Sequence, residues 1–137
     1  MLHITVGLPG SGKTTWAKQF CSNKEIYRIS SDDIRLMLYN DPALISPIEF
    51  QLMEICMEDL LKKNKDVLLD ATMLKEITRT KFIVKARAIN PNIGITLHVF
   101  DIPYEKVLER NLLRSERIIV PENIIESMND KAQWPTD

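Results

Sequence analysis

The chain has 137 residues and a net charge of −1 at pH 7, with 18 Lys+Arg against 19 Asp+Glu. This length predicts one domain covering residues 1–137 with its own hydrophobic core, and 45% apolar residues exclude disorder for the bulk of it. No apolar run approaches the roughly 20 residues of a membrane span. The first residues also lack the pattern of a signal peptide, so we expect a cytoplasmic protein without membrane partners, in the host cytoplasm if it is phage-encoded.

The charges and the cysteines narrow the function classes further. Residues 75–117 hold nine Lys/Arg against five Asp/Glu, whereas the rest of the chain is acidic. Such a basic segment is typical either of a phosphate-binding face or of solvated helix faces. Cys21 and Cys56 have no metal-binding spacing, so free thiols are expected, with a single disulfide left open.

Apolar β-branched runs alternate with amphipathic stretches along the whole chain. The patterns predict strands at 2–6, 26–29, 67–69 and 93–100, and helices at 13–22, 32–39, 46–64, 75–89, 103–114 and 121–129. This alternation predicts an α/β fold with a four-stranded parallel sheet flanked by helices. Ligands bind beyond the carboxyl ends of the strands in such sheets, so functional residues should follow the ends of the four strands.

The segment between the first strand and the first helix carries the most specific motif. Residues 7–14, GLPGSGKT, match G-x-x-x-x-G-K-[ST] in full. Glycines there let backbone N–H groups surround phosphate oxygens, and the helix N-terminus adds a positive dipole end. We expect Lys13 to reach the β- and γ-phosphates of ATP or GTP and the Thr14 hydroxyl to ligate Mg²⁺. The predicted nucleotide-binding residues are Gly7, Pro9, Gly10, Ser11, Gly12, Lys13, Thr14, Thr15, Arg110 and Arg114.

Carboxylates follow the second and third predicted strands. Asp32 is placed to accept a proton from an attacking hydroxyl and to reach Mg²⁺ through water. Asp33 and Arg35 are candidate acceptor contacts, although Asp33 equally suits the positive end of a helix dipole. Asp70 stands at the position where an aspartate steers Mg²⁺ through water, with a simple turn as the alternative.

Three further groups of residues complete the predicted site. Thr72 and Arg79 are candidate acceptor contacts, with a solvated Arg79 as the alternative. Arg110 and Arg114 share one helix face four residues apart, so we expect a small lid that neutralises charge on the transferring phosphoryl group, with Arg117 just beyond it. The alternative is surface ion pairing with Glu105, Glu109 or Glu116.

Three aromatic residues are assigned to packing rather than to chemistry. His3 and His98 lie inside predicted strands without clustered partners, which indicates core or edge histidines. Trp16 is expected to pack the first helix on the sheet.

Five blocks together resemble the P-loop 5′-hydroxyl polynucleotide kinases, above all the bacteriophage kinase/phosphatase members. They are GLPGSGKTTWAKQF (7–20), ISSDDIR (29–35), LLDATMLKEITR (68–79), HVFDIPYEKVLERNLLR (98–114) and VPENIIESM (120–128). The resemblance implies an adenylate-kinase-like P-loop fold and Mg²⁺-assisted transfer of the γ-phosphate of ATP or GTP to the 5′-hydroxyl of DNA or RNA.

The resemblance also implies residue roles. Lys13 and Thr14 would hold the donor phosphates and Mg²⁺, and Asp32 would be the general base. Arg35 would engage the acceptor, and Arg114 would be the lid arginine with Arg110 beside it.

Two departures from that family bear on the acceptor and the metal. Ser31 stands where the phage enzymes have a basic residue, and Ala71 stands where they have an aspartate, for which the neighbouring Asp70 is expected to substitute. Two alternatives therefore stay open beside the polynucleotide kinase. One is a kinase of a small metabolite hydroxyl, and the other is a nucleotide-binding switch or repair subunit without transfer activity. The residues favour no oligomeric state.

Overall fold

The sheet of the computed structural model has the predicted four parallel strands. The structure describes residues 1–22, 24–41, 46–114 and 119–136. Within them, β1 (Leu2–Gly7), β2 (Ile26–Ser30), β3 (Asp66–Asp70) and β4 (Ile95–Phe100) pair in the order β2-β3-β1-β4. All three strand pairs are parallel, so all four carboxyl ends lie on one edge of the sheet. The predicted α/β architecture is confirmed.

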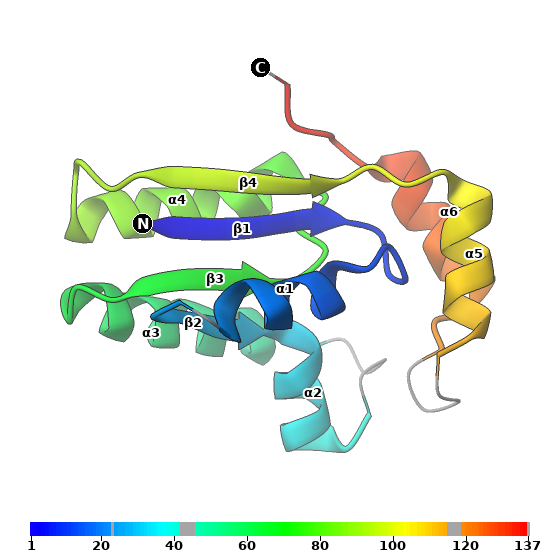
Figure 1. Ribbon diagram of the computed structural model, residues 1–137, viewed down its shortest axis with the longest axis horizontal. Coiled ribbons are helices and arrows are strands. Elements are labelled where there is room, and N and C mark those ends of the chain that lie inside the picture. The colour runs from blue at the N-terminus through cyan, green and yellow to red at the C-terminus, as the bar shows by residue number, and fades with distance from the viewer. Residues whose placement is uncertain (23, 42–45, 115–118, 137) are drawn as a thin grey trace.

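Six helices surround the sheet in the described residues (Figure 1). They are α1 (Lys13–Ser22), α2 (Ser31–Tyr39), α3 (Pro47–Lys62), α4 (Glu76–Ile89), α5 (Tyr104–Leu112) and α6 (Glu122–Lys131). Helix α1 covers one face of the sheet, α3 and α4 cover the other, and α5 and α6 stand beyond the carboxyl ends of the strands (Figure 1). None of the described helices is long and apolar enough to cross a membrane.

Local signals explain where two helices begin. The Ser30 hydroxyl accepts a hydrogen bond from the Asp33 backbone N–H at 3.2 Å and caps α2. The Ser46 hydroxyl accepts one from the Ile48 N–H at 3.4 Å, and Pro47 occupies the first turn of α3. These starts follow the predicted pattern, whereas β4 begins two residues later than predicted because residues 90–93 form a turn closed by Ile93 N–H and Asn90 C=O.

The core lies between the sheet and the helices α3 and α4. Its largest fully buried side chains include Leu2, Ile4, Met53, Met57 and Phe82. Buried Thr5 then ties the ends of two strands together, since its hydroxyl donates to the Ala71 carbonyl at 2.8 Å and accepts from the Ala71 N–H at 3.1 Å. The Gly7 N–H donates to the Thr72 carbonyl at 3.0 Å, so β3 holds the start of the phosphate-binding segment in place.

The opposite face of β1 and β4 carries an aromatic cluster under α1. His3 Nδ1 and His98 Nε2 lie 2.9 Å apart, and the Trp16 ring lies 4.5 Å from the His98 ring between centroids. Phe20 stacks on Trp16. Trp16 therefore packs α1 on the sheet as predicted, but the prediction that the two histidines lack clustered partners was wrong, because neighbouring parallel strands bring them together.

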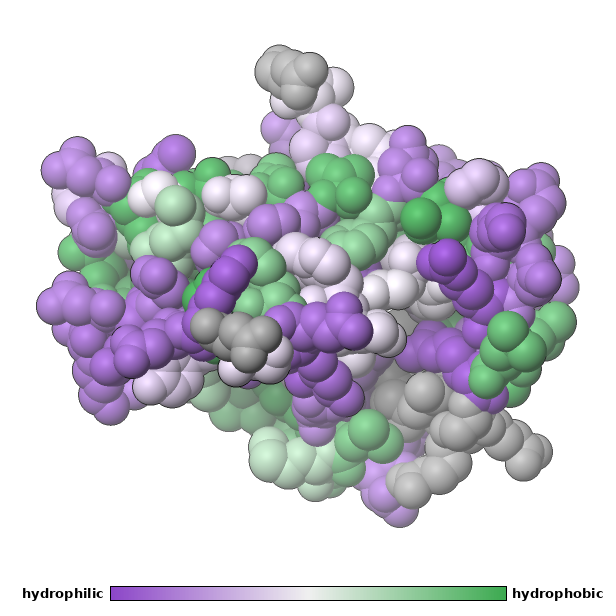
Figure 2. All heavy atoms as spheres, in the orientation of Figure 1, coloured by the Kyte–Doolittle hydropathy of each residue, from purple (hydrophilic) through white to green (hydrophobic). Residues whose placement is uncertain are grey.

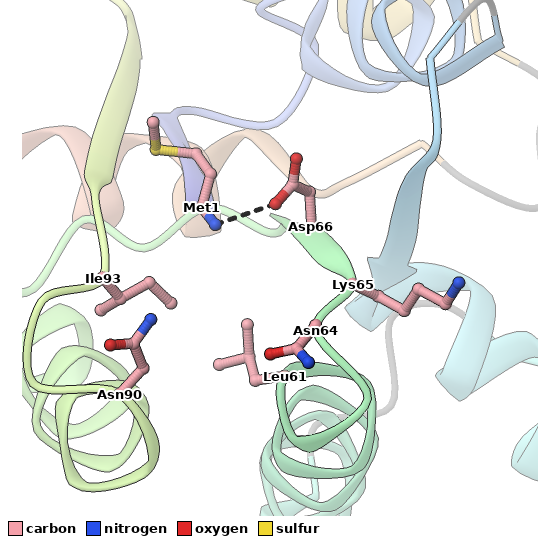
Figure 3. A pocket seen from close by; sticks show the side chains of 7 residues that line it. All are labelled: Met1, Leu61, Asn64, Lys65, Asp66, Asn90 and Ile93. Carbon is pink, nitrogen blue, oxygen red and sulfur yellow. Dashed lines mark hydrogen bonds and ion pairs between the residues drawn. The ribbon is translucent and has the colours of Figure 1, made fainter.

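The two cysteines and a pocket at the amino ends of the strands lie outside the predicted site. Cys21 and Cys56 are free thiols, as expected. A shallow pocket of about 110 Å³ lies at the amino ends of the strands, remote from the predicted site (Figure 3). The terminal amine of Met1 pairs there with Asp66 at 2.9 Å (Figure 3). Its polar lining is thus already engaged in the fold.

Candidate active site

The phosphate-binding loop is a backbone structure held from outside by α5. Gly10 and Gly12 have φ values of +80° and +94°, a region that favours glycine. A Cβ on Gly10 would lie 3.1 Å from the Val107 carbonyl oxygen, and Arg110 Nη1 donates to the Ser11 carbonyl at 3.2 Å. Pro9 is half-buried in this loop. Contacts with α5 therefore hold the loop in this shape.

Lys13 lies inside the loop at the start of α1. Its Nζ donates to the Leu8 carbonyl at 2.7 Å, and the residue is buried. Burial lowers the pKa of Lys13 to about 8, against the attraction of Asp70 and Asp32. A buried ammonium held by a single carbonyl is suited to exchange that oxygen for a phosphate oxygen.

Two buried polar atoms test whether an anion suits this site. Ser11 Oγ and Arg114 Nη1 have no hydrogen-bond partner within the described residues. A buried donor without an acceptor is costly, and phosphate oxygens are acceptors of the right kind. The loop therefore fits a phosphate group by its own unmet hydrogen bonds.

The protein oxygens near the loop fit Mg²⁺ only together with phosphate. The described residues contain no group of three or more His, Cys, Asp or Glu that could hold a metal ion. Mg²⁺ commonly takes one or two protein oxygens and completes its shell with water and substrate phosphates. The half-buried Thr14 hydroxyl on the first turn of α1 suits that role, and bound Mg²⁺ supplies charge neutralisation on the phosphates. Thr15 is exposed on the same turn.

Asp32 lies between two arginines that come from different elements. Arg35 Nη1 on α2 lies 3.4 Å from Asp32 Oδ1, and Arg114 Nη2 lies 3.8 Å from Asp32 Oδ2. The Asp32 side chain is 43% exposed. Both contacts are long, so the two arginines orient the carboxylate and leave it accessible to an acceptor hydroxyl. The structure thus brings together three residues that the sequence predicted to act jointly.

Arg114 reaches Asp32 because the end of α5 is anchored. The Asn111 side chain donates to the Val120 carbonyl at 2.7 Å and accepts from the Val120 N–H at 3.0 Å. Within the described part of the chain, Arg110 and Arg114 pair with neither Glu105 nor Glu109, so that alternative is not supported. Arg117, Glu116 and the rest of residues 115–118 lie outside the described residues.

Asp70, predicted to steer Mg²⁺, forms an ion pair with Arg28 that was not predicted from the sequence. Asp70 is 3% exposed, and its Oδ2 accepts from Arg28 Nε at 2.9 Å and lies 2.8 Å from Arg28 Nη2. Arg28 also donates to Asp33 at 2.8 Å. The Asp33 carboxylate therefore pairs with Arg28, and this ion pair competes with the acceptor contact predicted for Asp33. An arginine in the middle of the short strand β2 was the available signal.

Arg79 also has a structural environment rather than the predicted acceptor contact. The residue is buried, and its guanidinium donates to the Met73 and Gln133 carbonyls, each at 2.8 Å. The Gln133 N–H donates to the Leu74 carbonyl at 2.8 Å. Arg79 therefore joins the start of α4 to the C-terminal segment, and these backbone contacts compete with the acceptor contact predicted for it. Thr72, in contrast, stays beside the loop through its bond to Gly7.

Most of the basic character of α4 is likewise structural or solvated. Lys85 lies 3.4 Å from Glu54 and 3.6 Å from Glu58 on α3, and Arg79 is buried. Within the described residues of this basic segment, Arg110 on α5 donates to the loop and Arg114 just after α5 lies beside Asp32. Residues 75–117 were predicted to form either a phosphate-binding face or solvated helix faces. The basic residues of α4 fit the second interpretation, and Arg110 on α5 fits the first.

The fold and this site define a P-loop kinase-like domain. A family model described as an AAA domain matches residues 2–135, and the chain belongs to that family. The chain is 29% identical over 140 residues to a bifunctional polynucleotide kinase/RNA ligase of Autographa californica nuclear polyhedrosis virus, covering 90% of this chain and 20% of that protein. The resemblance to polynucleotide kinases is thereby confirmed at the level of the family.

Solved structures agree with this assignment. A chain of the Pnkp1/Rnl/Hen1 RNA repair complex matches with a TM-score of 0.79 and 30% identity, over 93% of this chain and 42% of that one. A gluconokinase from Sinorhizobium meliloti 1021 matches with a TM-score of 0.66 over 97% of this chain and 75% of that one, but at 17% identity it shows the fold alone. The chain spans about a fifth of the viral relative and less than half of the repair-complex chain.

Proposed function

We propose that the protein transfers the γ-phosphate of ATP or GTP to the 5′-hydroxyl end of DNA or RNA, assisted by Mg²⁺. The observation that carries the proposal is the placement of Asp32 between Arg35 and Arg114, facing the loop that holds Lys13. A carboxylate with two guanidiniums beside a phosphate-binding lysine is the set of groups that phosphoryl transfer to a hydroxyl requires. The polynucleotide kinase named in the viral relative supports the choice of acceptor.

The residues divide the reaction between them. The acceptor oxygen attacks the γ-phosphorus while the bond to the β,γ-bridging oxygen breaks, and the nucleoside diphosphate leaves. The Asp32 carboxylate takes the hydroxyl proton. Lys13 and Arg114 stabilise the charge on the phosphoryl oxygens, with Arg110 beside them on the loop, and Arg35 orients the acceptor.

The surface beside these groups favours a nucleic acid over a small polar acceptor. Exposed apolar side chains lie on both sides of the site, at Met37 and Leu38 on α2 and at Leu112 and Leu113 at the end of α5. Figure 2 shows green surface over the outer parts of α2 and α5. Nucleobases can lie on apolar side chains, whereas a sugar acid offers hydroxyls that need polar partners.

The direct test is phosphorylation of a short oligonucleotide that bears a 5′-hydroxyl, with γ-labelled ATP and Mg²⁺. The Asp32→Asn variant should lose about 10²–10⁴-fold in turnover and keep nucleotide binding. Asp33→Asn is the matched control one residue away and should stay active, since Asp33 pairs with Arg28.

Other outcomes would replace the proposal. Label on gluconate or another small polyol, but not on the oligonucleotide, would establish a metabolite kinase. Nucleotide binding without transfer to any hydroxyl would indicate a switch or a repair subunit. For a polynucleotide acceptor, KM should rise with salt because phosphates are contacted, whereas a small uncharged acceptor should show no such dependence.

A further inference from the structure

Glu49 is a buried carboxylate in an unusual place, close to the start of α3. The residue is 1% exposed, among the most buried in the chain. An ionised carboxylate in that environment is costly unless a cation and hydrogen bonds compensate it. Burial accordingly raises the pKa of Glu49, and Arg35 opposes that shift. A group kept at such a cost calls for a role.

Helix capping does not supply that role. The sequence pattern predicts Glu49 as part of the start signal of α3, where an acid in the first turn complements the dipole. In the structure the Ser46 hydroxyl and Pro47 serve the helix start. The Glu49 carboxylate instead forms an ion pair with Arg35 Nε on α2, across the junction of two helices.

Arg35 is held at both edges of its guanidinium. Its Nε faces Glu49, while Nη1 lies 3.4 Å from Asp32 and Nη2 donates to the Ser31 hydroxyl at 3.2 Å. The Arg35 side chain is largely buried. Glu49 therefore fixes the inner edge of the same group whose outer edge lies beside the proposed base.

We propose that Glu49 is the positioning residue for acceptor binding, because it locks the Arg35 guanidinium in the orientation that receives the acceptor next to Asp32. The inference rests on the proposed function. A free arginine side chain loses much rotamer freedom when it binds a ligand, and a partner that orders it beforehand removes that loss. Among the described residues, the ion pair of Glu49 is with Arg35 on α2 rather than with the phosphate-binding loop, so its effect should fall on the acceptor and spare the nucleotide.

The charges around Asp32 are balanced with Glu49 included. Asp32 on α2 and Glu49 on α3 face Arg35 on α2 and Arg114 after α5, with Lys13 at the start of α1 beyond them. Without the Glu49 charge, the pull of Asp32 on the Arg35 guanidinium is no longer opposed from α3. The guanidinium would then shift toward the proposed base and away from the position in which it meets the acceptor.

The test compares Glu49→Gln with Glu54→Gln. Glutamine keeps the size and one hydrogen-bond acceptor, and Glu54 lies on the same helix but pairs with Lys85. Glu49→Gln should raise the acceptor KM about tenfold or more, as expected for loss of a charge-assisted bond. Its nucleotide Kd should stay close to that of Glu54→Gln, whereas its melting temperature should fall because one member of a buried ion pair is removed. The same KM in both variants would overturn the proposal.

A double-variant cycle separates positioning from packing. If Glu49 acts through Arg35, Glu49→Gln combined with Arg35→Gln should be no worse in acceptor KM than Arg35→Gln alone. Additive losses, or a loss of nucleotide affinity in Glu49→Gln that parallels the rise in acceptor KM, would assign Glu49 to structure and overturn the inference. A wild-type protein that phosphorylates no oligonucleotide would instead contradict the proposed function.

Discussion

The donor and acceptor sides of the site are built by different physical means. On the donor side, the backbone conformation forms the site: Gly10 and Gly12 shape the loop, and Lys13 lies buried within it. On the acceptor side, ion pairs between α2, α3 and the end of α5 place Asp32 and Arg35. A loop motif is contiguous in sequence, whereas the ion pairs join residues that only the fold brings together.

The largest effect is expected from breaking the donor side at Lys13. Lys13→Ala removes a buried cation beside the phosphates and should lower kcat/KM about 10²–10³-fold, the range for loss of one electrostatic contact to a developing charge. Nucleotide affinity should fall with it, measured by titration calorimetry. Lys18→Ala, an exposed lysine on the same helix, is the control. Unchanged nucleotide binding in Lys13→Ala would show that the loop does not hold the donor.

The sequence predicted the sheet well and placed the donor-side residues in one loop, for a physical reason. The glycines, Lys13 and Thr14 are neighbours along the chain, and strand–helix alternation determines a parallel sheet almost by itself. Arg28, Glu49 and Arg79 were missed or misassigned because their partners lie on other elements. Which cation a buried carboxylate takes depends on strand order and helix contacts, and neither can be read from local spacing.

The next effect tests the competing partners of Asp70. Asp70→Asn removes one member of a buried ion pair and should lower the free energy of unfolding by about 3 kcal/mol. Denaturant unfolding measures this loss, and Asp33→Asn, the more exposed partner of Arg28, should cost less than about 1 kcal/mol. Asp70→Asn should leave the Mg²⁺ concentration for half-maximal activity unchanged. A large rise in that concentration at intact stability would return Asp70 to its predicted metal role.

A smaller effect is expected from a substitution that tests the contact between the loop and α5. Gly10→Ala places a Cβ 3.1 Å from the Val107 carbonyl at a φ of +80°, so the loop and α5 must separate. We expect a loss of about 1–2 kcal/mol in stability together with weaker nucleotide binding. Gly94→Ala is the control, because its Cβ meets only the flexible end of Met1 and its φ is not positive. Equal losses in both variants would mean that α5 does not brace the loop.

The smallest effect concerns pH and the histidine pair under α1. Burial lowers the pKa of both His3 and His98 below 6.5. For His3, the charges of His98, the terminal amine and Lys24 lower the pKa further, whereas Asp66 raises it. For His98, the charge of Lys24 adds to the effect of burial. The unfolded chain therefore binds more protons than the folded one below about pH 6.5, so this contribution to stability is complete above that pH and is lost as pH falls.

Unfolding at pH 5.5 and pH 8, followed by tryptophan fluorescence, measures that loss. His98→Asn should cost at most about 1 kcal/mol at pH 8, the worth of one hydrogen bond, and should flatten the decline toward pH 5.5. Because Trp16 on α1 packs on His98, the decline should be accompanied by weaker nucleotide binding at the N-terminus of the same helix. An unchanged pH slope in His98→Asn would assign the acid sensitivity to groups other than His98.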